Sequence, residues 1–483
     1  MDTIFQKNRK LPIQVKASFW FLIASFFQRG ISVITTPLFT RLLTAEEYGQ
    51  FNVFNSWFSL FTIIIALNLT GGAYTQGIIK FSEEREKFSS SIHGLSLSIL
   101  VIWLIIYVII WQPINNLLKL ETYQVLALFL LVGTNSISGF WFLGKRVDFD
   151  YKPLVIITIL TAVLRPATEL GLVLYMSDHV KARIYGWVLV YVITYSWMCV
   201  HQFMKDNTFF CKKYWKYALA FNIPLVPHYL SQTVLNMSDR IMISQMVGDR
   251  EAGVYSLAYS IALIMTLFNT SIINTLTPWA LQMIKEGNQN KIGNVFYICM
   301  LIIGGVNILL ILFAPELVRI FAPSEYYEAI WVIPPVSIGT YFMFLYNLLA
   351  VFEFYFEKTK FIMVASVLAA VLNIILNVVC IRAFGYVAAG YTTLICYIVY
   401  VVCHYNCYKK TQTENNPGKY ALSGSKFFWI SFVITALGLL LAASYFAAYI
   451  RYGISLILIV SIILLRSMWL PIARNMLREM DII

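Results

Sequence analysis

The chain has 483 residues, of which 59% are hydrophobic and only 12% are charged. Soluble globular domains carry roughly 25% charged residues, so the composition excludes an ordinary soluble enzyme and predicts an integral membrane protein. The formal net charge of +12 would suggest nucleic acid as a partner in a soluble protein.

Apolar windows recur along the whole length, and about 14 of them are long enough to cross a hydrocarbon core as a helix. They leave no room for a soluble domain. The first window contains Arg29 and is not followed by a small-residue cleavage site, so we expect it to remain as the first span. The predicted spans are residues 18–39, 48–69, 92–111, 124–143, 153–176, 184–204, 218–247, 254–278, 292–313, 330–355, 361–381, 386–408, 427–450 and 452–470.

The loops between these spans carry Lys and Arg unevenly. Alternate loops, counted together with both tails, hold most of the basic residues. The positive-inside rule therefore predicts that both termini lie in the cytoplasm. It also explains the net charge without nucleic acid as a partner.

The first span carries a polar stripe at helical spacing. Arg29 has no acidic residue within a turn of its own helix, so it is the best candidate for a charge that awaits a ligand. Pro37 predicts a bend farther along. The stripe consists of Ser25, Gln28, Arg29, Ser32 and Thr36.

The fifth span contains Arg165 and Glu169, four residues apart and therefore on one helix face. A charge at the bilayer centre costs about 2.5 to 3.5 kcal/mol even on the most lenient insertion scale. We therefore expect these charges to face water or each other. A buried structural ion pair is the alternative to a functional site.

The seventh span repeats the polar stripe with His228, Gln232, Asn236 and then Asp239 or Arg240. These spacings place the side chains on one face, which cannot face lipid. For Asp239 and Arg240 the alternative is a span that ends early and lets Arg240 reach the outer interface. For His228 it is a satisfied hydrogen bond rather than a proton relay.

Polar residues in the later spans are ambiguous. Asn269 and Asn274 in the eighth span, and Asn373 and Asn377 in the eleventh, are either sugar-facing groups or hydrogen bonds between helices. The group Cys403, His404 and Cys407 lacks a second ligand pair of metal-site spacing, so we predict no metal there.

The sequence supports neither of two motifs that are typical of nucleotide-dependent enzymes. Asp148-Phe149-Asp150 resembles the DxD motif of glycosyltransferases, but it lies in a short loop with no nucleotide-binding domain. No GxxxxGK[ST] loop occurs, so the chain does not hydrolyse ATP itself. We expect neither a cofactor nor an enzymatic activity.

Two segments with similar sequences suggest an internal repeat. LTAEEYGQFN (residues 43–52) and VGDREAGVYS (residues 247–256) each follow a span with a polar stripe and open the next span. Six spans separate them, an even number, so both copies have the same orientation, as in several transporter families. We predict an all-α membrane fold with two six-helix bundles, related as parallel repeats around a central cavity, and two C-terminal helices. The predicted regions are bundle 1–204, cytoplasmic linker 205–217, bundle 218–408, cytoplasmic linker 409–426, and residues 427–483 with two additional helices and a cytoplasmic tail.

Three stretches resemble the bacterial polysaccharide transporter family, the O-antigen and capsule flippases of the multidrug, oligosaccharidyl-lipid and polysaccharide exporter superfamily. They are TPLFTRLLTAEEYGQFNVFNSW, PLVPHYLSQTVLNMSDRIMISQMVGDREAGVYSLAYS and NIILNVVCIRAFGYVAAGYTTL. The resemblance extends through about residue 408. The run from Gly385 to Gly390 departs slightly from the commoner Gly-Ala-Ala pattern of the family.

The resemblance implies an outward flippase for undecaprenyl-pyrophosphate-linked oligosaccharide in the bacterial inner membrane, working by alternating access. Its implied partners are that lipid-linked oligosaccharide, the lipid bilayer, a polysaccharide polymerase and a chain-length regulator, but no nucleic acid. The alternatives are a lipid II or drug exporter of the same superfamily, or a membrane glycan polymerase. We expect Arg29, Arg165 and Arg240 to bind pyrophosphate, because the guanidinium fork pairs with phosphate oxygens. Cavity-lining or ion-coupling roles are expected for Glu169, Asp239, His228, Gln28, Gln232 and Asn236.

Overall fold

The computed structural model describes residues 12–415, 420–464 and 466, and all of its regular elements are helices. The predicted C-terminal tail and part of the second predicted linker lie outside these residues. Eleven described helices are long and apolar enough to cross a membrane. Three further helices, α3, α11 and α20, occupy the remaining predicted spans. The predicted all-helical membrane fold is confirmed.

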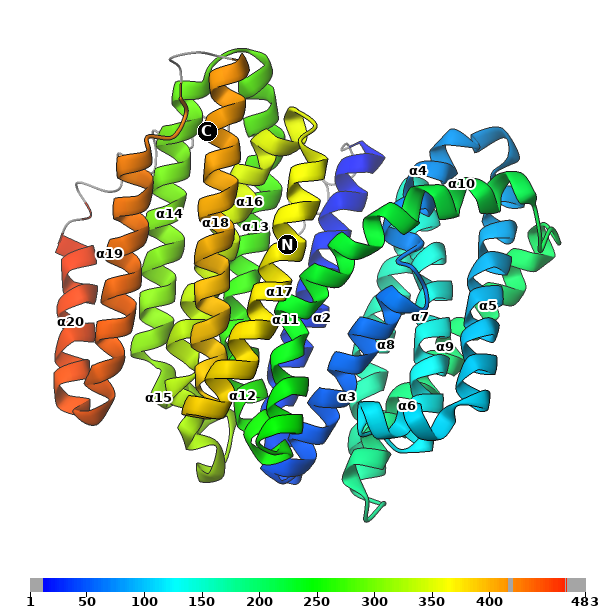
Figure 1. Cartoon of the computed structure of the whole chain (residues 1–483), viewed down its shortest axis with the longest axis horizontal. Coiled ribbons are helices and arrows are strands. Elements are labelled where there is room, and N and C mark those ends of the chain that lie inside the picture. Colours follow the sequence, from blue (N-terminus) through cyan, green and yellow to red (C-terminus); the bar gives the residue numbers. More distant parts are fainter. Residues whose placement is uncertain (1–11, 416–419, 465, 467–483) are drawn as a thin grey trace, which may run out of the picture. The chain divides into compact units, whose positions relative to one another are not determined.

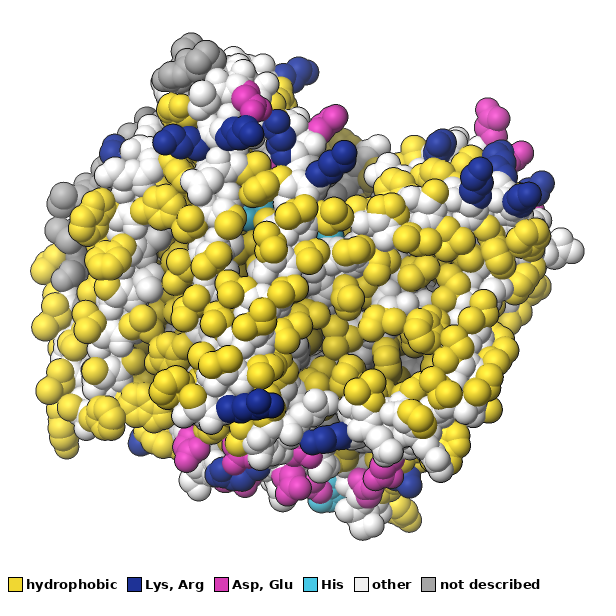
Figure 2. Space-filling view, in the orientation of Figure 1, with side chains coloured by type: hydrophobic (Ala, Val, Ile, Leu, Met, Phe, Trp, Pro, Cys, Tyr) yellow, Lys and Arg dark blue, Asp and Glu magenta, His cyan; other side chains and the backbone are white. Residues whose placement is uncertain are grey.

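The chain divides into two compact units, residues Met1–Ala252 and Gly253–Ile483. In Figure 2, hydrophobic side chains cover the surface of each unit between its ends, and charged side chains gather at those ends. This distribution is that of a multi-pass membrane protein. The first unit includes the seventh predicted span, whereas the sequence suggests a boundary at residues 205–217, so the two six-helix bundles stay a prediction.

In the N-terminal unit, α9 packs against both α7 and α8, and α2 packs along α8 (Figure 1). Side-chain carboxylate or hydroxyl groups cap the first turns of α3, α7 and α9, where Glu121 caps α7. Thr44 and Glu47 form a capping box at the start of α3, and Asp178 accepts a hydrogen bond from the Lys181 N–H at the start of α9. The elements are α2 (Ile13–Leu42), α3 (Ala45–Ile64), η1 (Thr70–Tyr74), α4 (Thr75–Lys80), η2 (Ser82–Glu84), α5 (Arg85–Ile109), α6 (Trp111–Leu118), α7 (Thr122–Val147), α8 (Tyr151–Val173), α9 (His179–Lys205), α10 (Lys212–Asn222), η3 (Ile223–Leu225) and α11 (Val226–Met246).

The second predicted span is not one continuous helix. α3 ends at Ile64, and the chain resumes as the π-helical turn η1. Between them Leu67 and Asn68 have φ angles of 52° and 47°, in the left-handed region that residues with side chains rarely adopt. Such backbone strain persists only where neighbouring groups hold it in place.

The side chain of Asn222, at the end of α10, stabilises the interruption between α3 and η1. Its Oδ1 accepts a hydrogen bond from the Ala73 N–H at 2.7 Å, and its Nδ2 donates to the Leu67 carbonyl at 2.8 Å. A Cβ atom at Gly72 would lie 2.3 Å from the same Oδ1, so this close approach requires glycine. The buried amide thereby satisfies backbone groups on both sides of the interruption.

The seventh predicted span is also interrupted. The short 3-10 turn η3 separates α10 from α11, and Pro224 and Pro227 lie in or beside it. Proline removes backbone donors and favours such an interruption of a helix. α10 begins at Lys212, inside the predicted linker, and packs against η1 and α5.

In the C-terminal unit, α16 forms the centre. The apolar window of α16 is 83% buried, the highest share among the eleven candidate spans, and α16 packs against α13, α14 and α18. The last two helices pack at the side of α14, where the Tyr445 hydroxyl donates to the Ile311 carbonyl at 2.6 Å and Arg451 pairs with Glu316 (Figure 1). The elements are α12 (Asp249–Ala262), which begins before the boundary, α13 (Ile264–Lys285), α14 (Gln289–Leu312), α15 (Ala314–Phe321), η4 (Ser324–Trp331), α16 (Ile333–Tyr355), α17 (Thr359–Phe384), α18 (Ala388–Asn415), α19 (Gly424–Ala442), η5 (Ala443–Phe446) and α20 (Ala448–Leu464).

Candidate functional site

A charged cluster joins α8 to α9 in the N-terminal unit. The Glu169 Oε1 accepts a hydrogen bond from Arg165 Nε at 2.7 Å, and Oε2 accepts from Nε and Nη2 of Arg183, each at 3.2 Å. The Glu169 side chain is only 2% exposed, and that of Arg183 is 8% exposed. One buried carboxylate is therefore shared by two guanidinium groups, and the cluster keeps a net positive charge.

Aromatic rings cover both guanidinium groups. The Arg183 Cζ lies 3.9 Å from the ring centre of Phe39 on α2 and 3.5 Å from that of Phe51 on α3, and the Arg165 Cζ lies 3.8 Å from that of Trp187. Cation–π contacts of this kind stabilise a charge that has been removed from water. The cluster thus ties α2 and α3 to α8 and α9.

The sequence analysis did not single out Arg183, because it placed this residue in an outward loop. In the structure α9 begins at His179 and carries Arg183 in its second turn. The available signal was the sequence Arg-Ile-Tyr-Gly-Trp, which continues into an apolar window. Gly186 permits the close approach of α9 to α8, because a Cβ atom there would lie 2.9 Å from the Glu169 backbone.

Arg29 lies in a different environment. Its side chain is exposed in the middle of α2, between the exposed residues Phe26 and Ile34. Within the described part of the chain, no ion pair or hydrogen bond involves its guanidinium. Gln28 beside it is also exposed, whereas the hydroxyl of Thr36 donates to the Ser32 carbonyl of the same helix. Arg29 is therefore a membrane-helix cation that has no counter-charge among the residues that the structure describes.

The polar stripe predicted for the seventh span lies on a single helix. α11 contains His228, Gln232, Asn236, Asp239 and Arg240, so their spacing places them along one face. Neighbouring turns are linked by an Asn236 hydrogen bond to the Gln232 carbonyl at 2.7 Å and an Arg240 bond to the Asn236 carbonyl at 3.0 Å. The alternative of an early helix end is wrong, because α11 continues to Met246 and Arg240 is 5% exposed.

α11 packs along α3 within the same unit. Neither helix is among the eleven apolar candidate spans, because each carries many polar side chains. On α3 several of these groups bond to their own helix, including Asn52 to the Tyr48 carbonyl and Ser56 to the Asn52 carbonyl. The candidate site of this unit therefore comprises two separate features: the contacting polar helices α3 and α11, and the exposed Arg29 on α2.

The asparagines of the C-terminal unit fall into two groups. Asn269 is buried and donates to the Thr340 carbonyl at 3.0 Å, whereas Asn274 on the same helix is exposed. Asn373 and Asn377 are buried and link α17 to α18. Asn373 Nδ2 donates to the Thr393 hydroxyl at 3.0 Å, and the Thr392 hydroxyl donates to Asn377 Oδ1. The alternative of hydrogen bonds between helices is therefore observed for this pair.

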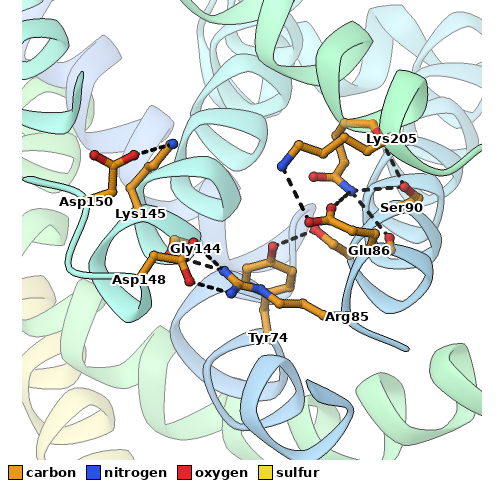
Figure 3. Close-up of polar contacts among 11 residues, drawn as sticks. Tyr74, Arg85, Glu86, Ser90, Gly144, Lys145, Asp148, Asp150 and Lys205 are labelled. Atoms are coloured by element: carbon orange, nitrogen blue, oxygen red, sulfur yellow. Dashed lines mark hydrogen bonds and ion pairs between the residues drawn. The ribbon is translucent and has the colours of Figure 1, made fainter. Parts of the chain in front are cut away.

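A second polar cluster lies at the α4 end of the N-terminal unit, and Figure 3 shows its contacts. Arg85 pairs with Asp148, and Lys145 pairs with Asp150 at 2.6 Å. Both carboxylates of the DxD-like sequence thus have cationic partners from the protein.

The same cluster includes hydrogen bonds from uncharged side chains. Gln202 on α9 donates to the Glu86 carboxylate at 3.1 Å, and the hydroxyls of Tyr74 and Ser89 lie 2.6 Å apart. These contacts hold α5, α7 and α9 together at this end of the unit.

Comparisons with known proteins complete the assignment. A curated relative, an uncharacterized membrane protein of Haemophilus influenzae, is 24% identical over 74% of this chain and 88% of its own length. Another, named as the probable low-salt glycan biosynthesis flippase Agl15 of Haloferax volcanii, is 22% identical over 80% of this chain and 82% of its own length. The solved structure of the Lipid II flippase MurJ in an inward closed conformation covers 88% of this chain and 98% of its own chain. Its TM-score is 0.64 at 15% sequence identity, which shows a shared fold.

Two family models match the sequence. The MatE model covers residues 224–379, across the boundary between the two units. The model described as polysaccharide biosynthesis protein covers residues 15–284, more than half of the chain. This match includes α2, α3 and α11, which carry the candidate site, and it confirms the resemblance predicted from the sequence. The chain belongs to the polysaccharide biosynthesis protein family.

Proposed function

We propose that the chain is a flippase that moves undecaprenyl-pyrophosphate-linked oligosaccharide from the cytoplasmic to the outer face of the bacterial inner membrane. Its family membership supports a role in polysaccharide synthesis, and a relative over 80% of the chain is named as a probable glycan biosynthesis flippase. The lipid tail would stay in the bilayer while the pyrophosphate and sugars cross by alternating access. Both termini would lie in the cytoplasm.

The observation that carries this proposal is the exposed Arg29 on a 30-residue membrane helix. A lipid-facing charge would cost about 2.5 to 3.5 kcal/mol or more, so its retention needs a compensating interaction. A pyrophosphate oxygen supplies one, because the guanidinium fork stays charged and pairs with phosphate. Arg165 is already bound to Glu169, so we assign the primary contact to Arg29 and secondary roles to Arg165 and Arg240.

The balance of charges in these helices indicates the direction in which a membrane potential would drive the empty transporter. The four arginines Arg29, Arg165, Arg183 and Arg240 outnumber Glu169 and Asp239, so an empty transporter carries a positive charge in these helices. An inside-negative potential would draw it inward, with about 2.3 kcal/mol per 100 mV for each charge that crosses the full field. In the loaded transporter, the pyrophosphate neutralises these positive charges. The membrane potential then no longer draws them inward.

The test is translocation of a short lipid-linked oligosaccharide in vesicles that contain the purified protein. Exposure of the sugar at the outer face is followed with an impermeant lectin, with and without an imposed potential. We expect Arg29→Ala to slow translocation about tenfold or more, since a charge-assisted hydrogen bond contributes about 1.5 to 3 kcal/mol. Arg29→Lys should retain part of the rate, because it keeps the charge but not the fork.

Arg146→Ala is the matched control, because Arg146 is an exposed arginine at the end of α7. It should translocate like the wild type. Unchanged transport by Arg29→Ala would refute the assigned contact, and no transport by the wild type would refute the substrate. Lipid II and a cationic drug, added in parallel vesicles, test the two other exporter functions.

A further inference from the structure

A histidine–carboxylate pair is buried in the C-terminal unit, outside the candidate site of the N-terminal unit. The Nδ1 atom of His404 on α18 lies 2.8 and 2.7 Å from the two carboxylate oxygens of Glu353 on α16. Both side chains have 0% exposure. The two residues are 51 positions apart in the chain. The pair joins the central helix of the unit to one of its principal neighbours.

The pair lies close to one end of its bundle. α16 ends at Tyr355, two residues after Glu353, and the Lys358 N–H donates to the Glu353 carbonyl at 2.8 Å. Just beyond it, Lys358 forms an exposed ion pair with Glu414 at 3.1 Å. A helix rises 1.5 Å per residue, so only about one turn of protein separates the buried carboxylate from that exposed surface.

The groups that face the pair are neutral. The ring centres of Tyr400, Tyr346 and Phe361 lie 4.3, 4.7 and 5.5 Å from that of His404. The Tyr400 hydroxyl is 2.9 Å from that of Ser366, and the Cys407 thiol bonds to Glu353. Lys358, just beyond the end of α16, pairs with Glu414 at 3.1 Å.

The contact of Nδ1 with two carboxylate oxygens is favourable when Nδ1 carries a proton, which the neutral ring already supplies. With a neutral ring and an ionised Glu353, the pair has a net negative charge at zero exposure, which a buried environment strongly disfavours. One further proton, on Nε2 or on the carboxylate, makes the pair neutral.

The other ring nitrogen makes the site incomplete. The His404 Nε2 is buried and has no hydrogen-bond partner among the described residues. An unsatisfied buried polar atom destabilises the fold unless a water molecule or another group meets it. Nε2 is therefore a free position for a proton or a water molecule.

We propose that Glu353 and His404 form a binding site for one exchangeable proton, reached from the α16–α17 end of the C-terminal unit. Loss of the proton leaves a negative charge that needs water, so it loosens the contact between α16 and α18. Binding of the proton closes that contact again. Proton occupancy and helix packing are thereby linked, independently of the proposed transport function.

The first test follows the histidine directly. Wild-type protein with ring-¹⁵N-labelled histidine is placed in lipid bilayers and titrated by solid-state NMR, and His404→Gln identifies the His404 signal. We expect this signal to change between its protonated and neutral forms as the pH rises, and Glu353→Gln to shift the midpoint. A signal that is constant with pH, or that Glu353→Gln leaves unchanged, would overturn the proposal.

The second test uses stability and works without an activity assay. Above about pH 6.5, the ordinary pKa of histidine, the unfolded chain releases a proton that the folded pair retains. The unfolding constant of the wild type should therefore rise about tenfold per pH unit, relative to a Glu353→Gln/His404→Gln double variant. The stabilising difference between the two proteins is complete below that pH and shrinks above it.

His201→Gln is the matched control, because His201 is an exposed histidine on α9. Its stability relative to the wild type should not vary with pH in this way. A pH-independent difference between the wild type and the double variant would refute the bound proton. If the double variant does not fold, the NMR titration of the wild type and the single Glu353→Gln variant still decides the question.

Discussion

The arginines Arg183 and Arg29 of the N-terminal unit occupy contrasting environments on helices of the same membrane bundle. Arg183 lies between two aromatic rings and shares a buried carboxylate with Arg165. Arg29 is exposed and has no such partner among the described residues. The difference separates two uses of an intramembrane charge. A charge with its partner built in holds helices together, whereas a charge without one is available to a ligand.

The largest expected effect is that of Glu169→Gln. This change leaves Arg165 and Arg183 without their shared counter-charge in a site that excludes water. Removal of one partner of a buried ion pair destabilises a protein by about 3 to 5 kcal/mol. A thermal unfolding scan of the purified protein should show a clearly lower midpoint than the wild type. Glu83→Gln, at an exposed glutamate, is the control, and equal midpoints for both variants would contradict the assigned role.

A smaller effect is expected for Arg183→Lys. The charge is kept, but the planar group between Phe39 and Phe51 is lost, together with one of the two bonds to Glu169. Cation–π contacts and the fixed fork of arginine make this a loss of about 1 to 2 kcal/mol. Arg146→Lys provides the same change at an exposed position. Equal losses of stability in the two variants would show that the aromatic contacts contribute nothing.

The smallest effect on stability is expected for Arg29→Ala. The side chain makes no ion pair in the described structure, so its removal should lower the stability by no more than about 0.5 kcal/mol, as for most surface substitutions. Thermal unfolding in the same detergent provides the measurement. A loss comparable to that of Glu169→Gln would mean that Arg29 is a structural charge, and the contrast between the two arginines would disappear.

Much of the fold could be predicted because a membrane span is a local property. Length and hydropathy identify the helices, and a four-residue spacing places Arg165 beside Glu169 without knowledge of the fold. The observed ion pair between these two residues matches that spacing. The polar stripe of α11 follows from the same rule.

The rest depends on contacts between residues far apart in the chain. Arg183 reaches Glu169 across the turn between α8 and α9, and His404 reaches Glu353 over 51 positions. No periodicity within one helix indicates either contact. The interruption after α3 was missed for the same reason, because Leu67 and Asn68 are not residues that usually adopt positive φ. In the described structure, the Asn222 side chain supports this turn through the Leu67 carbonyl.

The hydrogen bonds of the Asn222 side chain also affect the order in which the N-terminal unit folds during synthesis. Asn222 lies 149 residues after Ala73, so the ribosome completes four more long helices before this side chain exists. Until then, the Ala73 N–H and the Leu67 carbonyl need water or another temporary partner. The newly inserted second span should therefore settle into its final shape only after α10 has been synthesised and has docked against η1. Early chain segments that lack residue 222 are the species most exposed to quality-control proteolysis.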